Sequence, residues 1–309
     1  MRRWSLILFL FAPMSFADEI KSRESRITDD HARFGFASEI RFMSTDANFT
    51  NTGNERDPLA AGNSYQHSAW RNTLMYRPKK TIEYRIGFEM AQAISETSQA
   101  KRDQTGLSQF SLAFDYDWVV PHGVWQPGVE LIYPMTTVSD NQDQVLLGEG
   151  AIELNPHLAW KFNFYGVQML SDIGASLRDG GRASLLNYKI LPGFALGNTI
   201  CRLGVRGYTT LVDDQYTSQS SKRLNIINAV DGGSYAFYSI NPSQFAALFE
   251  IDWAMNAQWG FKLSADKTYT GRNSADALVV ALGVVGHLGK IKPRIKTERD
   301  QKLEEFEPD

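Results

Sequence analysis

The residues best suited to chemistry in this sequence are its five histidines, and two of them stand in a suggestive context. His67 directly precedes Ser68, which places a base beside a hydroxyl, as nucleophilic catalysis requires. Adjacent residues on a strand point to opposite faces, so this pair is poorly arranged for mutual activation. His157 has no nucleophile and orienting group at a useful spacing, so we interpret it as a polar residue of an interior surface.

Other kinds of chemistry have no sequence support. The chain contains no metal-ligand spacing, phosphate-binding loop or dinucleotide fingerprint, so we expect no metal and no cofactor. Its formal net charge of −3 gives no basic footprint for nucleic acid. The single cysteine, Cys201, cannot form an internal disulfide. The remaining candidates are charged side chains, and their spacing is regular.

Charged and apolar residues alternate along the chain. Between residues 81 and 91 every even position from Ile82 to Met90 is apolar, whereas the odd positions include Glu83, Arg85 and Glu89. Residues 109–118 repeat the pattern with a strongly aromatic apolar set. Side chains of a strand point alternately to its two faces, so these segments are predicted to be strands with one apolar and one charged face.

The same alternation predicts twelve strands, at about 32–43, 66–77, 81–91, 109–118, 124–135, 147–162, 165–177, 185–196, 199–211, 235–253, 258–268 and 277–288. A densely aromatic face opposite a charged face is typical of a transmembrane barrel that is apolar outside and polar inside. We therefore predict an all-β fold, a single antiparallel up-and-down transmembrane β-barrel of about twelve strands. Pro134, Pro156 and Pro192 lie inside strand candidates, and a strand split at Pro156 would change the count, so ten or fourteen strands stay open.

Connections and tryptophans indicate which rim is which. Short turns at 77–80, 120–123, 163–164, 197–198 and 255–257 alternate with links that are mostly longer, such as 46–65 and 212–234. If the amino terminus is periplasmic, strand parity puts every short turn in the periplasm and every long loop outside. Five tryptophans stand near the short turns, and we predict that they form an aromatic girdle at the membrane interface: Trp118, Trp125, Trp160, Trp253 and Trp259.

The ends of the chain are of a different composition. Residues 1–17 read as a cleaved signal peptide, with Arg2 and Arg3, a short apolar run and Ser15-Phe16-Ala17. Residues 18–30 are then an amino-terminal periplasmic segment, 31–289 the barrel, and 290–309 a charged tail without periodicity that we predict to be a disordered periplasmic extension.

The charged faces supply the candidate site. We predict that these residues line the lumen: Arg33, Glu39, Arg41, Glu83, Arg85, Glu89, Asp115, Asp117, Glu130, Glu153, His157, Lys161, Lys189, Arg202, Arg206, Glu250, Asp252, Lys262 and Asp266. In one interpretation they line a pathway and select what passes. In the other they pair into a network that fills a narrow barrel. Arg85 is expected at the level of Asp115 and Asp117. The positive and negative charges of the predicted lining are too evenly balanced to predict ion selectivity.

In architecture the chain from residue 18 onward resembles bacterial outer-membrane β-barrels of the twelve-strand size. Its length and strand rhythm also resemble barrels linked to uptake of aromatic or hydrophobic compounds, such as the phenol meta-pathway group. The resemblance implies a place in the cell outer membrane, contact with outer-membrane lipid and the barrel-assembly machinery, and a small solute or ligand in the lumen. It carries no individual site residue, and the oligomeric state stays open.

These observations predict a channel or porin-like transporter for passive or facilitated passage of small solutes, and not an enzyme. One alternative is an outer-membrane lipid hydrolase, although the histidine–serine–asparagine–glycine signature of the barrel phospholipases does not occur in this sequence. The other is a structural or adhesive barrel that acts through its extracellular loops 46–65 and 212–234.

Overall fold

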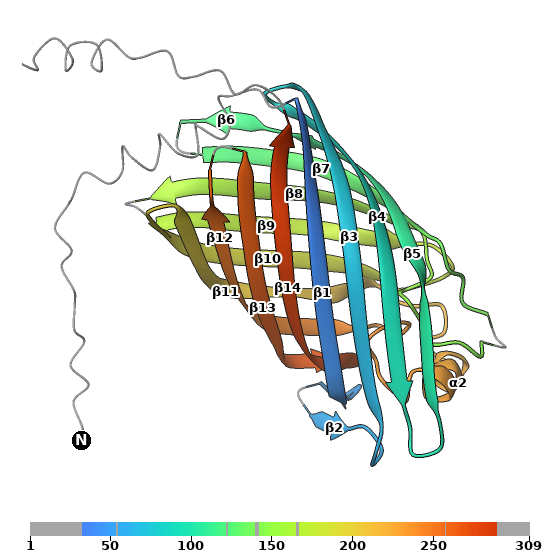
Figure 1. Ribbon diagram of the computed structural model, residues 1–309. Helices are drawn as coiled ribbons and strands as arrows, with labels where there is room; N and C mark the ends of the chain where they lie inside the picture. The colour runs from blue at the N-terminus through green and yellow to red at the C-terminus, as the bar shows by residue number, and fades with distance from the viewer. Residues whose placement is uncertain are drawn as a thin grey trace, which may run out of the picture.

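The computed structural model describes residues 33–53, 55–121, 123–139, 142–164, 167–256 and 258–288. The predicted signal peptide 1–17, the segment 18–30 and the tail 290–309 lie outside this part of the chain. Fourteen strands form a single sheet, and two of them, β2 (Arg56–Pro58) and β6 (Trp118–Val120), have only three residues each. The other twelve are the long strands of a barrel (Figure 1).

The long strands are β1 (Phe34–Phe49), β3 (Ser64–Lys79), β4 (Ile82–Glu96), β5 (Lys101–Tyr116), β7 (Gly123–Pro134), β8 (Glu153–Phe164), β9 (Val167–Arg178), β10 (Ser184–Leu196), β11 (Thr199–Val212), β12 (Ser243–Ala254), β13 (Trp259–Arg272) and β14 (Ser274–Leu288). Each pairs antiparallel with the next in chain order, and β14 pairs with β1 to close the ring. The predicted all-β, up-and-down twelve-strand barrel is confirmed.

The prolines interrupt hydrogen bonds without splitting strands. The ladder between β8 and β9 stops after Leu154, skips Asn155 and Pro156, and resumes at His157 in the same register. The β10–β11 ladder likewise skips Pro192 and continues in register. A proline removes one ladder donor, and the flanking pairs hold the strand in place. The count of twelve follows, and counts of ten and fourteen long strands are excluded.

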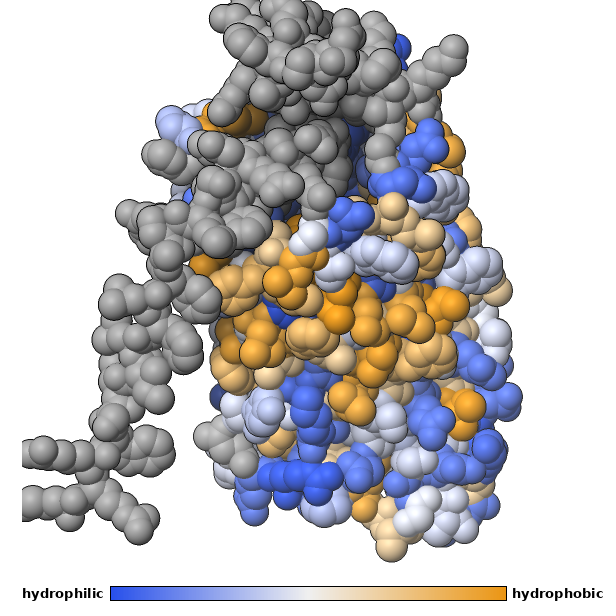
Figure 2. Space-filling view, turned by 60° about the vertical axis from the view of Figure 1, so that its left-hand side comes forward, coloured by the Kyte–Doolittle hydropathy of each residue, from blue (hydrophilic) through white to orange (hydrophobic). Residues whose placement is uncertain are grey.

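The outside of the barrel carries the apolar residues of the alternation. Ile40, Leu74, Ile86, Leu203 and Leu282 each expose more than two fifths of their surface. Figure 2 shows hydrophobic residues gathered in a band across the middle of the barrel, with hydrophilic residues beyond it. An exposed apolar band of this extent is the surface that lipid covers in transmembrane barrels.

The two rims differ, but less simply than predicted. We call the end where Phe34 pairs with Leu288 the terminal rim and the opposite end the loop rim. Connections on the terminal rim are short, as expected. On the loop rim, 50–63, 135–152 and 213–242 are long, whereas 97–100, 179–183 and the single residue Asn273 make tight turns. The prediction that every short turn lies on one rim is therefore wrong.

The strand limits explain this difference. β4 and β5 run to Glu96 and from Lys101, well past the predicted ends at 91 and 109, because small residues continue the buried face. Conversely, β8 begins at Glu153 rather than 147, and β12 at Ser243 rather than 235. The residues thus released belong to the loops, and one loop contains a helix that the strand pattern did not predict, α2 (Ser221–Val230). In Figure 1, α2 lies at the same end of the barrel as β2.

Candidate functional site: the lumen and its loop plug

The predicted lumen residues lie on the face opposite the apolar band. Arg33 is the exception, since it is exposed just before β1. Residues of different strands meet there as ion pairs, including Arg77 with Glu83 on neighbouring strands and Arg206 of β11 with Asp266 of β13, at 2.7 Å across β12. Glu89 instead accepts a hydrogen bond of 2.9 Å from the hydroxyl of Ser108. These contacts run along the charged face of the wall, and passage of a solute along that face stays a prediction.

Asp115 is the centre of one network. Its Oδ2 lies 2.6 Å from Nη2 of Arg85, as the sequence register predicted, and its Oδ1 lies 3.0 Å from Nε2 of His157. The side chain of Asp115 is almost fully buried, whereas those of its two partners are partly exposed. His157 thus contacts a carboxylate and, within the described residues, no hydroxyl nucleophile, which favours a structural role.

Two further networks hold the wall. Arg202 pairs with Asp252 and lies 3.9 Å from Glu250, and Lys262 lies 3.3 Å from the same Glu250 carboxylate. Arg71 of β3 reaches past β4 and β5 to Glu130 of β7 and also donates to Ser111 at 3.2 Å. Sequence reasoning missed Arg71, although it stands at an inward position of the second predicted strand. Many of the lining residues are therefore engaged in ion pairs, and whether these pairs fill the lumen stays a prediction.

The lining also contains polar groups without protein partners. Lys161 and Lys189 face the same lumen and form no ion pair with any described residue. Asp117 Oδ1, Asn155 Oδ1 and Gln168 Oε1 are buried and accept no hydrogen bond from the described part of the chain. An unsatisfied buried polar atom costs about 1–3 kcal/mol. These groups favour an interior that water or a polar solute can reach.

The five predicted girdle tryptophans all lie toward the terminal rim. Trp125 pairs with Trp118 in one ladder and with Trp160 in the next, and its ring stacks on that of Trp160 with centroids 4.9 Å apart. Trp253 stacks on Phe261, and Trp259 meets Phe36 edge to face. Their contact with a membrane interface stays a prediction.

The half of the lumen nearer the loop rim is filled by two loops. We call residues 142–152 and 213–242 together the loop plug. Val145 and Leu147 are buried against Tyr65, Ala69 and Ala93 on the inner wall. Leu146 of the same loop packs on Ile226 and Val230 of α2. Phe237 packs against both of these clusters, and Ala236 packs against the first and against Ala275, Ala277 and Val279 of β14. The loops therefore bury an apolar core inside the barrel.

Hydrogen bonds fasten the plug to the wall. Tyr65 Oη donates to the carbonyl of Leu146 at 2.9 Å. Asn48 donates to the carbonyl of Gly233 at 2.7 Å and accepts from the amide of Tyr235 at 2.8 Å. Gly232 and Gly233 have φ of +63° and +87°, so the chain reverses sharply after α2 in a conformation that favours glycine. That reversal brings the plug backbone to the polar side chains of β1.

A buried ionic cluster joins the two plug loops to the turn 179–183. Glu149 pairs with Arg182 and lies 3.4 Å from Arg178, and Asp214 lies 2.9 Å from Nε of Arg223 and 3.9 Å from Arg182. The two arginines beside Glu149 lower the pKa of that carboxyl against the opposing effect of burial. We define the ionic cluster as these five residues, which sum to one net positive charge.

Asp231 directly follows α2, and the pKa of its carboxyl is raised, whereas that of Glu149 is lowered. Burial raises the pKa of the Asp231 carboxyl to about 8, the charge of Glu149 adds to the rise, and a hydrogen bond from the amide of Leu146 opposes it. That hydrogen bond is 3.0 Å long and connects the two loops of the plug. Asp231 therefore holds the plug together most readily in its protonated form.

His67 also belongs to the plug contact. Its Nε2 lies 3.3 Å from the carbonyl of Leu147, and its ring meets Phe237 edge to face at 5.1 Å. Ser68, its neighbour in sequence, stands on the other face of β3, as strand geometry requires. The contacts of His67 favour an anchoring role for the only base that stands beside a serine.

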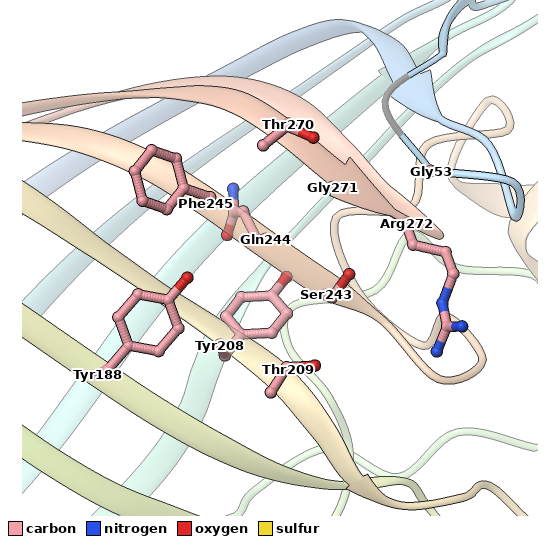
Figure 3. A pocket seen from close by; sticks show the side chains of 10 residues that line it. All are labelled: Gly53, Tyr188, Tyr208, Thr209, Ser243, Gln244, Phe245, Thr270, Gly271 and Arg272. Atoms are coloured by element: carbon pink, nitrogen blue, oxygen red, sulfur yellow. The ribbon is translucent and has the colours of Figure 1, made fainter.

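Two cavities lie at the loop rim. One, of about 440 Å³, is at the ends of β10 to β13, where the β11–β12 ladder stops at Tyr208 and Gln244. Figure 3 shows Tyr188, Tyr208 and Phe245 from three neighbouring strands around it. The other, of about 470 Å³, lies between α2, the segment 235–241 and the ends of β1 and β13. No group of three metal-binding side chains occurs in the described ranges, and no helix there is long and apolar enough to cross a membrane.

Neither a family model nor a curated protein sequence matches the chain. Solved structures do match by shape. The COG4313 outer membrane channel from Pseudomonas putida F1 has a TM-score of 0.63 at 11% identity, over 82% of this chain and 94% of that one. The KdgM porin has a TM-score of 0.45 at 7% identity, over 82% of this chain and 99% of that one. The TodX deltaS2S3 mutant monoaromatic hydrocarbon channel has a TM-score of 0.46 at 7% identity, over 85% of this chain and 92% of that one. At such identities the first likeness shows the fold, that of twelve-strand outer-membrane barrels, and the two lower scores carry no argument.

Proposed function

We propose that this protein is an outer-membrane channel for small solutes, and that the loop plug controls access to its lumen. The observation that carries the proposal is the division of the interior into two parts. From its middle to the terminal rim the wall is charged, with Lys189 and Lys161, which form no ion pair with a described residue, and with the buried, unsatisfied oxygens of Asp117 and Gln168. Toward the loop rim the plug buries apolar residues against that wall. A barrel that was only structural would have no need of a polar interior behind a separate plug.

The plug is suited to movement because it belongs to no strand and is held largely by side-chain contacts. It is attached by its apolar clusters on the wall, by side-chain hydrogen bonds, by the ionic cluster and by a few backbone hydrogen bonds, such as the one of 2.9 Å from the amide of Gln215 to the carbonyl of Gly181. Segments with few backbone hydrogen bonds to their surroundings open at lower free energy than strands of a closed sheet. We infer that opening of the plug exposes the charged lumen to the cell exterior while the barrel stays intact.

The test is single-channel conductance of the refolded protein in planar bilayers, with Lys161 and Lys189 both changed to Glu. These lysines form no ion pair with a described residue, although the charge of Asp117 acts on Lys161 and those of Glu250 and Asp172 act on Lys189. We expect steady conductance in the wild type and a reversal potential that shifts toward cations in the variant. Lys101→Glu is the matched control, because Lys101 is exposed at the loop rim and should leave selectivity nearly unchanged.

A folded, inserted barrel that stays silent, even with a loosened plug, would overturn the proposal. Lipid hydrolysis by the same preparation, lost on changing His67 or His157 to Ala, would then support the hydrolase alternative. Partner binding lost on trimming loops 46–65 and 212–234 would support the adhesive one.

A further inference from the structure

The second loop-rim cavity contains an arginine with an unused donor. Arg223 of α2 lines this cavity and is almost completely buried, with a relative exposure of 1%. Its Nε lies 2.9 Å from Asp214, and its guanidinium carbon lies 4.4 Å from the ring centre of Tyr238 and 5.1 Å from that of Tyr216. Neither its Nε, whose contact with Asp214 is an ion pair only, nor its Nη2 makes a hydrogen bond to a described residue. A guanidinium has five N–H donors, so one neighbouring carboxylate leaves part of the fork unsatisfied.

The five residues of the ionic cluster around Arg223 do not balance in charge, and Glu153 at the start of β8 is a further carboxyl on which Arg178 and Arg182 act. The ionic cluster contains three arginines against Glu149 and Asp214 and has one net positive charge. Asp231, the next carboxyl along the chain, is neutral over most of the acidic and neutral range because burial raises its pKa to about 8. A buried charge that is neither solvated nor paired is costly, so a bound anion would be favourable at this place.

The remaining lining is that of a site for a small organic molecule. Asn51 and Asn273 offer carboxamides, Ser220 and Ser239 offer hydroxyls, and Leu224 and the ring of Tyr235 offer apolar surface. A cavity of about 470 Å³ lies within the usual range for small-ligand sites. Arg272 also reaches this cavity, and Asp57 is the one carboxylate among its described lining residues.

We propose that this cavity binds a small organic monocarboxylate, whose carboxylate accepts a hydrogen bond from Nη2 of Arg223. The inference deepens the proposed channel function, on which its meaning as a solute site rests, because the ligand would bind on the plug at the outer mouth. Guanidinium and carboxylate have matching planar geometry, which makes this pairing stronger than one between neutral groups. The amides, hydroxyls and apolar side chains would contact the body of the ligand.

The test is isothermal titration calorimetry of the refolded wild-type protein in detergent. The probes are benzoate and gluconate, with benzamide as the uncharged counterpart of benzoate and inorganic phosphate as a different anion. We expect saturable one-to-one binding of at least one carboxylate and no measurable binding of benzamide or phosphate. Equal binding of benzoate and benzamide, tighter binding of phosphate, or no saturable binding of either carboxylate would overturn the proposal.

Variants locate the site. Ser220→Trp fills the cavity without removing a helix cap, since the Ser220 side chain makes no capping hydrogen bond, and should weaken carboxylate binding at least tenfold. Arg223→Lys keeps the positive charge beside Asp214 but loses the fork, and should weaken binding similarly. Ala229→Trp, on the exposed side of α2 and away from the cavity lining, is the matched control and should bind as the wild type does. Wild-type affinity in Ser220→Trp would refute the location.

The binding measurement and the conductance measurement separate the two proposals. A protein that conducts but binds no carboxylate would refute the site and leave the channel standing. A protein that binds carboxylate but never conducts would refute the channel and leave a ligand site on the barrel.

Discussion

Asp115 and His157 meet above the backbone of the strand that lies between them. Oδ1 of Asp115 on β5 is 3.0 Å from Nε2 of His157 on β8, and β7 passes beneath with Gly128 opposite both residues. A Cβ at Gly128 would collide with Oδ1 of Asp115 and would lie 2.6 Å from Cε1 of His157. The hydrogen bond therefore exists because the residue between its partners has no side chain.

Gly128→Ala should destabilise the barrel by about 1–3 kcal/mol, because the added methyl group forces the two side chains apart. Urea unfolding of the refolded protein, followed by the mobility shift between folded and unfolded forms, measures the change. Gly148→Ala is the matched control, since a Cβ there would meet no atom within 4 Å. Equal stability of the two variants would contradict the assigned contact.

Loosening the apolar core of the plug should increase conductance without unfolding the barrel. Val145→Ser combined with Leu147→Ser removes two side chains that are at most 2% exposed, each contributing about 1.5–3 kcal/mol to docking. We expect longer or larger openings in planar bilayers. Leu211→Ser with Val212→Ser, at the exposed end of β11, serves as the control and should conduct like the wild type. A plug variant with unchanged openings would argue against a controlling role for the plug.

Glu149→Gln should weaken docking of the plug by about 3–5 kcal/mol, because it leaves buried Arg178 and Arg182 without their shared carboxylate. Trypsin cleavage of the plug, for example at exposed Lys222, reports undocking. Glu96→Gln breaks an exposed pair with Lys101 and should cost less than about 1 kcal/mol. If both variants resist trypsin like the wild type, the ionic cluster does not hold the plug.

Docking of the plug should weaken as pH rises. The pKa of Asp231 is raised to about 8 in the docked plug, mainly by burial, and returns to about 4 when the carboxyl faces water. The docked form therefore binds more protons between these values. Its stabilisation is complete below about pH 4 and is lost as pH rises through about 8, by at most about 5 kcal/mol.

Protease sensitivity of the plug between about pH 5 and about pH 9, relative to an unstructured peptide under the same conditions, measures this dependence. Asp231→Asn keeps the acceptor for the amide of Leu146 and cannot ionise, so its profile should be flatter than that of the wild type. A wild-type profile that is equally flat would show that Asp231 does not titrate in this range.

The sequence by itself determined the barrel. Alternation between a lipid-facing and a polar-facing side chain has a period of two, so local residues alone indicate which segments are strands and which face of each is apolar. It placed Arg85 beside Asp115 and located the five tryptophans toward one rim. It also predicted which strand face is charged. Arg33 is an exception, because it lies outside β1. Arg71 stands at an inward position of the pattern, but the prediction left it out.

Only the tertiary structure decided what fills the barrel. Loops 142–152 and 213–242 have no period, and their burial depends on contacts between residues far apart in sequence, such as Tyr65 with Leu146 and Asn48 with Gly233. The apolar residues of helix α2 pack on the core of the plug, and they do not follow the period of two that identifies strands, so strand alternation could not predict this helix. Arg223 looks like an ordinary charged loop residue in the sequence. Its burial, its single carboxylate partner and its unused donor arise only when the loops fold into the lumen.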